Sequence, residues 1–333
     1  MTTPLEASVI IPCYTEERWD WTLEAIDSAK AQTRRPAEIV VVVDHNEHLL
    51  SRLRREVDGI VCLGNELQRG VSGARNSAVA SCETDVVAFL DDDAVAHPDW
   101  LAELLEPLSD EAVVGTGGVV LPSWQGRPPR WLPAEFAWVV GAFHASVPES
   151  PAPVRNVWGM SMAVRRALFE EVGGFRTGFG KLDDLSRPED TDFCIRVGRL
   201  VPDGRWVLVP GAVIEHRVPE RRASFSFFLR RCHNEGRQKI ALAELLGGRD
   251  SLGPEAEYIR RTLPSAMAAQ LRAALRERRS EPLLVAGAMA LGMGAAATGA
   301  AEELALRYGG RARTPRPAFT GPPAPAAPRA EAS

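Results

Sequence analysis

Short apolar runs alternate with segments of helical periodicity through the first ninety residues, and this alternation limits the possible folds more than any other feature. The predicted strands are residues 7–11, 38–43, 60–63 and 86–90. The helices predicted between them are residues 21–33, 49–57 and 74–79. Strands that alternate with helices in this way require a mostly parallel sheet with helices on both faces. The predicted fold class is therefore α/β.

The fourth apolar run, Val86–Asp93 with the sequence VVAFLDDD, ends in three consecutive carboxylates. An uninterrupted apolar run fits a strand buried on both faces, and open α/β sheets bind ligands at the carboxyl ends of such strands. Adjacent carboxylates repel one another unless a positive charge shares the site, and Mg²⁺ or Mn²⁺ accepts oxygen ligands. The stretch predicts a divalent-cation site. The motif alone leaves one alternative open, an exposed turn that leads into a capped helix.

The next hundred residues continue the pattern less regularly. The predicted elements are a helix over 98–108, strands over 112–120, 154–164, 206–209 and 213–214, and helices starting near 165 and 193. Glu189 and Asp190 fall in the first turn of the last helix, where acidic side chains complement the helix dipole. The segment 123–142 is rich in Trp, Pro and Arg, and we expect it to form a loop or a short helical segment that covers the predicted cation site.

Composition changes again after residue 220. The segment 221–240 is basic and aromatic, which suits a helix packed on the core or lying on an anionic membrane surface. Residues 282–301 carry no charge and could span a bilayer by length, but their Ala and Gly content favours a buried or membrane-dipping helix. The predicted organisation is a catalytic domain over 1–220, a helical extension over 221–310 and a disordered Pro/Ala-rich tail over 311–333.

Charge and cysteine content exclude some functions. The net charge of −5 argues against general binding of nucleic acid. The five cysteines show no C-x-x-C spacing, so neither a disulfide framework nor a zinc site is predicted. The first twelve residues lack the features of a secretory signal. We therefore expect a cytoplasmic protein, with peripheral contact at the inner face of the plasma membrane.

An ordered set of motifs resembles a known family. The set is VIIPCYTEE, Asp44 after the second strand, RGVSGARN, FLDDD, GMSMAVRR followed by GGF, PEDTDFCIR and EHR. Over about residues 7–240 it resembles the family 2 glycosyltransferases, inverting nucleotide-sugar enzymes of the Rossmann-like GT-A fold. The resemblance implies a nucleoside-diphosphate sugar donor, most often a UDP-sugar, a hydroxyl acceptor, and Mg²⁺ or Mn²⁺. The Q-x-x-R-W element and multiple membrane helices of the long polymerases are not found, which favours a single transfer.

The resemblance also implies roles for individual residues. Four match positions that hold the base and ribose: Pro12, Tyr14, Glu16 and Asp44. Arg75 matches a position near the nucleotide. Within FLDDD, the ribose or sugar contacts are Asp91 and Asp92, and the metal ligand is Asp93. Asp190 matches the catalytic base beside Glu189, His216 a second metal ligand, and Arg221 or Arg222 a diphosphate contact.

The acceptor is expected to be a hydroxyl, in one interpretation that of a polyprenyl-linked sugar. The Trp-rich segment, the basic aromatic stretch and the apolar C-terminal helix together resemble family members that act on lipid-linked carriers. The candidate acceptor contacts are Trp124, Trp131 and Trp158. Tryptophans in irregular loops stack on sugars, but they also pin such loops to the core, and the sequence leaves both readings open.

Two other functions compete. A sugar-nucleotide nucleotidyltransferase would need a Gly-rich, basic phosphate loop after the first strand, whereas Pro12–Glu16 is acidic and lacks glycine. A non-catalytic nucleotide- or carbohydrate-binding protein would not need the metal carboxylates together with Glu189 and Asp190. Both are disfavoured.

Overall fold

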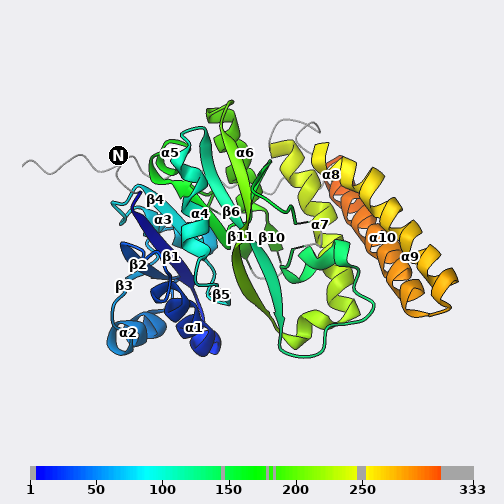
Figure 1. The fold of residues 1–333 in the computed structure, drawn as a ribbon, viewed down its shortest axis with the longest axis horizontal. Coiled ribbons are helices and arrows are strands. Elements are labelled where there is room, and N and C mark those ends of the chain that lie inside the picture. Colours follow the sequence, from blue (N-terminus) through cyan, green and yellow to red (C-terminus); the bar gives the residue numbers. More distant parts are fainter. Residues whose placement is uncertain (1–4, 144–146, 178–179, 183–184, 246–252, 309–333) are drawn as a thin grey trace, which may run out of the picture.

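The computed structural model describes residues 5–143, 147–177, 180–182, 185–245 and 253–308. A central mixed sheet has the strand order β3-β2-β1-β4-β8-β6-β11-β5, and β7 pairs with β11 (Figure 1). Its strands are β1 (Ala7–Cys13), β2 (Glu38–Val43), β3 (Val61–Gly64), β4 (Val86–Leu90), β5 (Ala94–Ala96), β6 (Val113–Trp124), β7 (Ala152–Val154), β8 (Ser161–Arg165) and β11 (Arg205–Val218). A separate hairpin pairs β9 (Gly180–Leu182) with β10 (Leu185–Arg187).

The first four strands are parallel, as the alternation of strands and helices predicts. Beyond β4 the sheet becomes mixed, because β8 is antiparallel to both β4 and β6. Antiparallel neighbours need no crossover helix, so the sequence around β8 does not show the alternation that marks the first half. The predicted α/β class is confirmed; β6 and β11 are again parallel, whereas β8, β5 and β7 run antiparallel to their neighbours.

Several strand boundaries differ from the predictions. Pro12 does not end β1, since the pairing with β4 already stops at Ile10 and the missing N–H costs no bond on that side. The predicted strand 154–164 is in fact two strands, β7 and β8. The two strands predicted near residue 210 are the single strand β11, which shifts register between Val209 and Val213. β5 is not among the predicted strands, because its three residues are too few to show a period.

Helices cover both faces of the sheet. They are α1 (Trp19–Lys30), α2 (Glu47–Glu56), α3 (Val71–Val79), α4 (Trp100–Leu105), α5 (Arg166–Glu171) and α6 (Glu189–Leu200), with short helices η1 (Glu16–Arg18), η2 (Pro107–Ser109), η3 (Ala134–Val140) and η4 (Glu220–Ala223). The predicted helix 98–108 breaks into α4 and η2 at Pro107. The helix predicted near residue 74 begins earlier, directly after Gly70, whose φ of 124° suits glycine.

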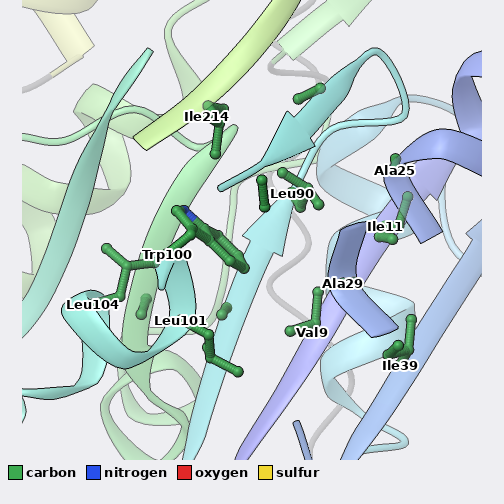
Figure 2. Packing of buried hydrophobic residues seen from close by; sticks show 14 of the residues in the cluster. Val9, Ile11, Ala25, Ala29, Ile39, Leu90, Trp100, Leu101, Leu104 and Ile214 are labelled. Carbon is green, nitrogen blue, oxygen red and sulfur yellow. The ribbon is translucent and has the colours of Figure 1, made fainter. Parts of the chain in front are cut away.

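Alternate residues of each strand pack into two apolar layers, one on each face of the sheet. Figure 2 shows Val9 of β1 on the same face as Ala29 of α1 and Trp100 of α4. Ile10 points to the opposite face and packs with residues of α3, α5 and α6, among them Phe193. The period of two along a strand explains this division. The sheet is therefore covered on both sides, and its carboxyl edge is left to hold polar groups.

Four further helical segments follow the sheet: α7 (Phe225–Leu245), α8 (Gly253–Glu257) with a π-helical turn (Tyr258–Thr262), α9 (Leu263–Glu277) and α10 (Glu281–Tyr308). In Figure 1, α10 packs against α7 on one side and α9 on the other. A Cβ on Gly236 of α7 would lie 1.9 Å from the carbonyl oxygen of Ala296, so these two helices pack backbone to backbone. By length and composition alone, α10 could cross a membrane.

The basic stretch that forms α7 is packed on the protein. Phe228 is fully buried in a third apolar cluster that also contains Phe136 of η3 and Met289 of α10. Arg237 of α7 forms an ion pair with Glu303 of α10 at 3.3 Å. Of the two readings of this stretch, the structure favours the core-packed helix. The predicted disordered tail, residues 311–333, lies outside the described residues.

Candidate active site

The polar residues gather at the carboxyl edge of the parallel strands. Asp91, Asp92 and Asp93 follow β4 directly, and Asp44 follows β2. Glu189 and Asp190 form the first turn of α6, as predicted. His216 lies inside β11 and pairs in register with Ala94, immediately after the carboxylates. Segments far apart in the sequence therefore meet at one edge of the sheet.

Arg75 joins the carboxylate triplet to the acidic turn of α6. Its guanidinium is buried, with Nη2 2.7 Å from Asp91 Oδ1 and Nη1 3.2 Å from Glu189 Oε1. A Cβ on Gly159 would lie 2.6 Å from Nη1, so any side chain there would force the buried guanidinium to shift. Burial and the charge of Asp190 together raise the pKa of Glu189 to about 7, against the opposing effect of Arg75.

Arg18 is the residue of this network that the sequence analysis missed. It ends η1, and its Nη1 lies 2.7 Å from Asp92 Oδ1 and 3.0 Å from Asp93 Oδ2. Burial and the charge of Asp93 raise the pKa of Asp92 to about 7, and Arg18 opposes that rise. The sequence does require a positive partner for the three carboxylates. Nothing in it indicates that the loop after the first strand supplies one.

Asp93 faces His216 from the other side. Asp93 Oδ2 lies 3.6 Å from His216 Nε2, and Arg222 Nη1 lies 3.3 Å from the same nitrogen. Burial alone would raise the pKa of Asp93, but the hydrogen bond with His216 and the positive charges of Arg18 and Arg222 outweigh it and hold the pKa well below its usual range. Arg221, the alternative diphosphate contact, is exposed, whereas Arg222 reaches this cluster.

The pair of Asp93 and His216 suits a divalent cation that takes its remaining ligands from substrate and water. Among the residues that the structure describes, no cluster of three or more His, Cys, Asp or Glu could hold a metal. Within the same residues, the buried Oδ2 of Asp92 has no hydrogen-bond partner. Mg²⁺ and Mn²⁺ use few protein ligands together with phosphate oxygens and water, so these residues fit such an ion.

Asp190 is held by backbone groups beside this cluster. Its Oδ1 accepts a hydrogen bond from the Thr191 N–H at 2.6 Å, and its Oδ2 accepts one from the Gly159 N–H at 3.4 Å. Burial raises the pKa of Asp190 above its ordinary value. Asp192, two residues later, is fully buried and binds Arg176 and Arg196 instead. The two aspartates of PEDTD therefore face different surroundings.

The predicted base and ribose contacts lie near the end of β1 and in the segments that directly follow β1 and β2. Asp44 accepts hydrogen bonds from Asn65 Nδ2 at 2.7 Å and from the Gly70 N–H at 2.9 Å, and so fixes the loop before α3. Tyr14 is 45% exposed. Glu16 pairs with His48, and Pro12 is buried in β1. Of these side chains, Tyr14 is the most available to a ligand.

The three candidate acceptor tryptophans make packing contacts. Trp131 packs edge-on against the rings of Phe225 and Phe228, with centroids 4.9 and 5.3 Å away. Trp158 packs on Phe143 at 4.7 Å. Trp124 at the end of β6 is partly buried against the third apolar cluster. These contacts give each tryptophan a structural role, and the sugar-stacking role stays a prediction.

Replacing Arg18 with Met is expected to make folding depend on a divalent cation. The change leaves Asp92 and Asp93 buried without their guanidinium, and a bound Mn²⁺ would restore the missing positive charge. Thermal unfolding should therefore show a larger rise in Tm on adding Mn²⁺ in Arg18→Met than in the unchanged protein. The matched control is Arg52→Met, whose guanidinium lies 3.7 Å from the Trp19 ring, away from the carboxylates. An equal Mn²⁺ response in all three proteins would contradict the expectation.

A mixed α/β sheet that gathers carboxylates, a histidine and buried arginines at its carboxyl edge is the arrangement of a GT-A glycosyltransferase. Comparison with known proteins agrees. The family model described as glycosyl transferase family 2 matches residues 8–173. The glucosyl-dolichyl phosphate glucuronosyltransferase of Haloferax volcanii is 33% identical over 240 residues, which cover 71% of this chain and 76% of that protein. The chain belongs to glycosyl transferase family 2 and is a glycosyltransferase.

The chain is also similar to three further proteins. The succinoglycan biosynthesis protein ExoM of Rhizobium meliloti is 28% identical over 204 residues, covering 59% of this chain and 62% of that protein. Among solved structures, the mannosyltransferase PcManGT from Pyrobaculum calidifontis, in complex with GDP-Man and Mn²⁺, has a TM-score of 0.57 at 23% identity over 91% of this chain and 88% of its own. GalNAc-T7 with UDP, GalNAc and Mn²⁺ has a TM-score of 0.52 at 17% identity, and the match covers 72% of this chain and 51% of its own. Both likenesses support the fold.

Proposed function

We propose that this glycosyltransferase moves one sugar, with inversion, from a nucleoside-diphosphate sugar to the hydroxyl of a lipid-linked acceptor in a metal-dependent reaction. The observation that carries the proposal is the bridge formed by Arg75, which ties the carboxylates after β4 to the acidic turn that holds Asp190. The segment proposed to bind the cation and the segment that carries the proposed base thus belong to one network. Displacement at an anomeric carbon requires both groups in one site. The solved neighbours bound to nucleotides and Mn²⁺ support the same class of donor.

Asp190 is the proposed general base. Its carboxylate is positioned by the N–H groups of Thr191 and Gly159, and its raised pKa makes it a better proton acceptor than an exposed aspartate. Direct displacement needs one base on the acceptor side, because a diphosphate is already a good leaving group. A divalent cation would supply charge stabilisation to that diphosphate.

The residues proposed to hold the cation are Asp93 and His216. Arg18 and Arg222 lie beside them and would pair with diphosphate oxygens, since guanidinium groups bind phosphate through two parallel hydrogen bonds. Arg75 orients Asp91 toward the ribose and sugar. In this scheme positive charge surrounds the leaving group, whereas the base stands on the far side of the Arg75 bridge.

The acceptor proposal rests on the relatives and on the helices after residue 220. The Haloferax volcanii relative is named for glucosyl-dolichyl phosphate, a lipid-linked sugar. A UDP-sugar is the proposed donor, at the cytoplasmic face of a membrane. Transfer assays with UDP-, GDP- and dTDP-sugars, Mn²⁺ or Mg²⁺ and a polyprenyl-phosphate sugar test the whole proposal. Absence of transfer from every donor, in protein that binds nucleotide, would overturn the choice of acceptor.

Replacing Asp93 with Ala is expected to remove metal-dependent nucleotide binding. The loss of a charged ligand should lower the affinity for UDP or GDP in the presence of Mn²⁺ by at least about tenfold. Isothermal titration with and without Mn²⁺ measures this directly. The control is Asp110→Ala, which removes an exposed carboxylate paired with Arg205 and should leave the affinity unchanged. Unaltered Mn²⁺ dependence in Asp93→Ala would refute the ligand assignment.

A further inference from the structure

We propose that the tip of the α9–α10 hairpin, residues 271–284, inserts into the surface of an anionic lipid bilayer. The tip consists of the last two turns of α9, the connecting turn and the first turn of α10. This inference rests on the proposed lipid-linked acceptor and names the surface that would meet the lipid. It concerns a segment outside the active site, and its test does not depend on activity.

The tip collects exposed leucines. Leu271, Leu275, Leu283 and Leu284 expose 46%, 82%, 53% and 57% of their surface. They are four of the twelve large apolar side chains that are exposed in the described part of the chain, within fourteen residues. All lie within about two helical turns, or roughly 10 Å, of the turn between the helices. Exposed apolar groups this concentrated indicate an interaction surface.

Arginines accompany the leucines. The tip carries Arg272, Arg276, Arg278 and Arg279 against Glu277 and Glu281, so it is positive on a chain whose net charge is −5. Arg278 closes α9 in the left-handed region at φ 53°, which turns the chain back into α10. Protruding leucines surrounded by arginines match the boundary between acyl chains and anionic headgroups. A second copy of the same tip would repel it, so a lipid surface is the better partner.

In Figure 1 the turn between α9 and α10 points to the lower right of the view, and β5 lies in the lower half of the same view. β5 begins directly after Asp93. Insertion of the tip would therefore hold the carboxyl edge of the sheet toward the bilayer, where a lipid-linked acceptor is presented.

The rest of α10 is attached to the protein. Met289 is fully buried in the third apolar cluster, and Gly299 lies so close to α7 that a Cβ would meet the His233 carbonyl oxygen at 2.0 Å. Glu303 pairs with Arg237 of α7 and with Arg307. A bilayer-spanning α10 would have to lose these contacts. Insertion of the tip alone preserves them.

Flotation of the full chain with lipid vesicles tests the proposal. We expect binding to vesicles that contain phosphatidylglycerol, weaker binding at high salt, and little binding to pure phosphatidylcholine. The double variant Leu275→Asp/Leu284→Asp should reduce the partition coefficient at least about tenfold. The triple variant Arg276→Gln/Arg278→Gln/Arg279→Gln should reduce it at least about tenfold on anionic vesicles only. The control Leu121→Asp/Leu200→Asp changes two exposed leucines outside the tip, 42% and 39% exposed, and should bind like the unchanged protein.

Other outcomes would overturn the proposal. Two of them concern vesicle binding: equal binding by the tip variants and the unchanged protein, or equal binding to neutral and anionic vesicles. A third is resistance to alkaline carbonate extraction, which would indicate a spanning helix. The fourth is a dimer in light scattering that the tip variants abolish. Mn²⁺-dependent nucleotide binding, measured in the same variants, should be unaffected. Its absence in every protein, with vesicle binding intact, would instead count against the proposed function.

Discussion

Replacing Asp190 with Asn is expected to abolish sugar transfer and to leave nucleotide and metal binding in place. The amide is nearly isosteric with the carboxylate, and its oxygen can still accept from the Thr191 N–H, so the first turn of α6 should keep its shape. It cannot accept a proton from the acceptor hydroxyl. A positioned general base contributes about 10²–10⁴-fold to rate, and kcat should fall by that factor. Transfer of labelled sugar measures kcat, and titration with UDP or GDP and Mn²⁺ measures binding.

Asp192 offers the matched control for this experiment. It lies two residues away in the same helix, but its carboxylate is buried against Arg176 and Arg196. We expect Asp192→Asn to lower Tm and to leave kcat for each folded molecule nearly unchanged. Full transfer by Asp190→Asn would refute the base assignment. An equal loss of kcat in both variants would indicate that the helix, and not the proton acceptor, had been damaged.

Replacing Arg75 with Met is expected to lower the free energy of unfolding by about 3–5 kcal/mol, because removal of one partner leaves the other charges buried and uncompensated. The charges in question are those of Asp91 and Glu189. The loss should depend on pH. Arg75 lowers the pKa of Glu189, so its removal raises that pKa further above about 7. Below that pKa Glu189 is neutral and needs no counter-charge, so the destabilisation should shrink in acid and grow in base.

Chemical unfolding of Arg75→Met on both sides of pH 7 checks this expectation. Arg261→Met serves as the control, since Arg261 forms an i,i+4 pair with Glu257 in which both side chains are exposed, and should contribute at most about 0.5 kcal/mol. Two outcomes would show that the Arg75 bridge makes no major electrostatic contribution to stability. One is a similar loss of unfolding free energy in the two variants, and the other is a loss for Arg75→Met that does not vary with pH.

The sequence predicts the first half of the sheet best, because there the apolar pattern of each segment matches its burial in the folded protein. The bounds predicted for β2 and β4 are those observed, because both are runs of apolar residues, in β2 after Glu38, that are followed directly by an aspartate. The predictions failed where neighbours in space decide the element. β5 is too short to have a period and exists only because it pairs with β11 at His216. The interrupted pattern around residue 210 is a register shift within one long strand.

By itself the sequence determined the family, the class of fold and the segments that carry polar groups to the sheet edge, since these follow from the order of motifs and from apolar periodicity. Only the tertiary structure decided which charges meet. Arg18 reaches Asp92 across 74 positions of sequence, and Arg75 reaches Glu189 across 114. Such pairs leave no local signal, because a buried ion pair depends on distance and desolvation in the folded chain.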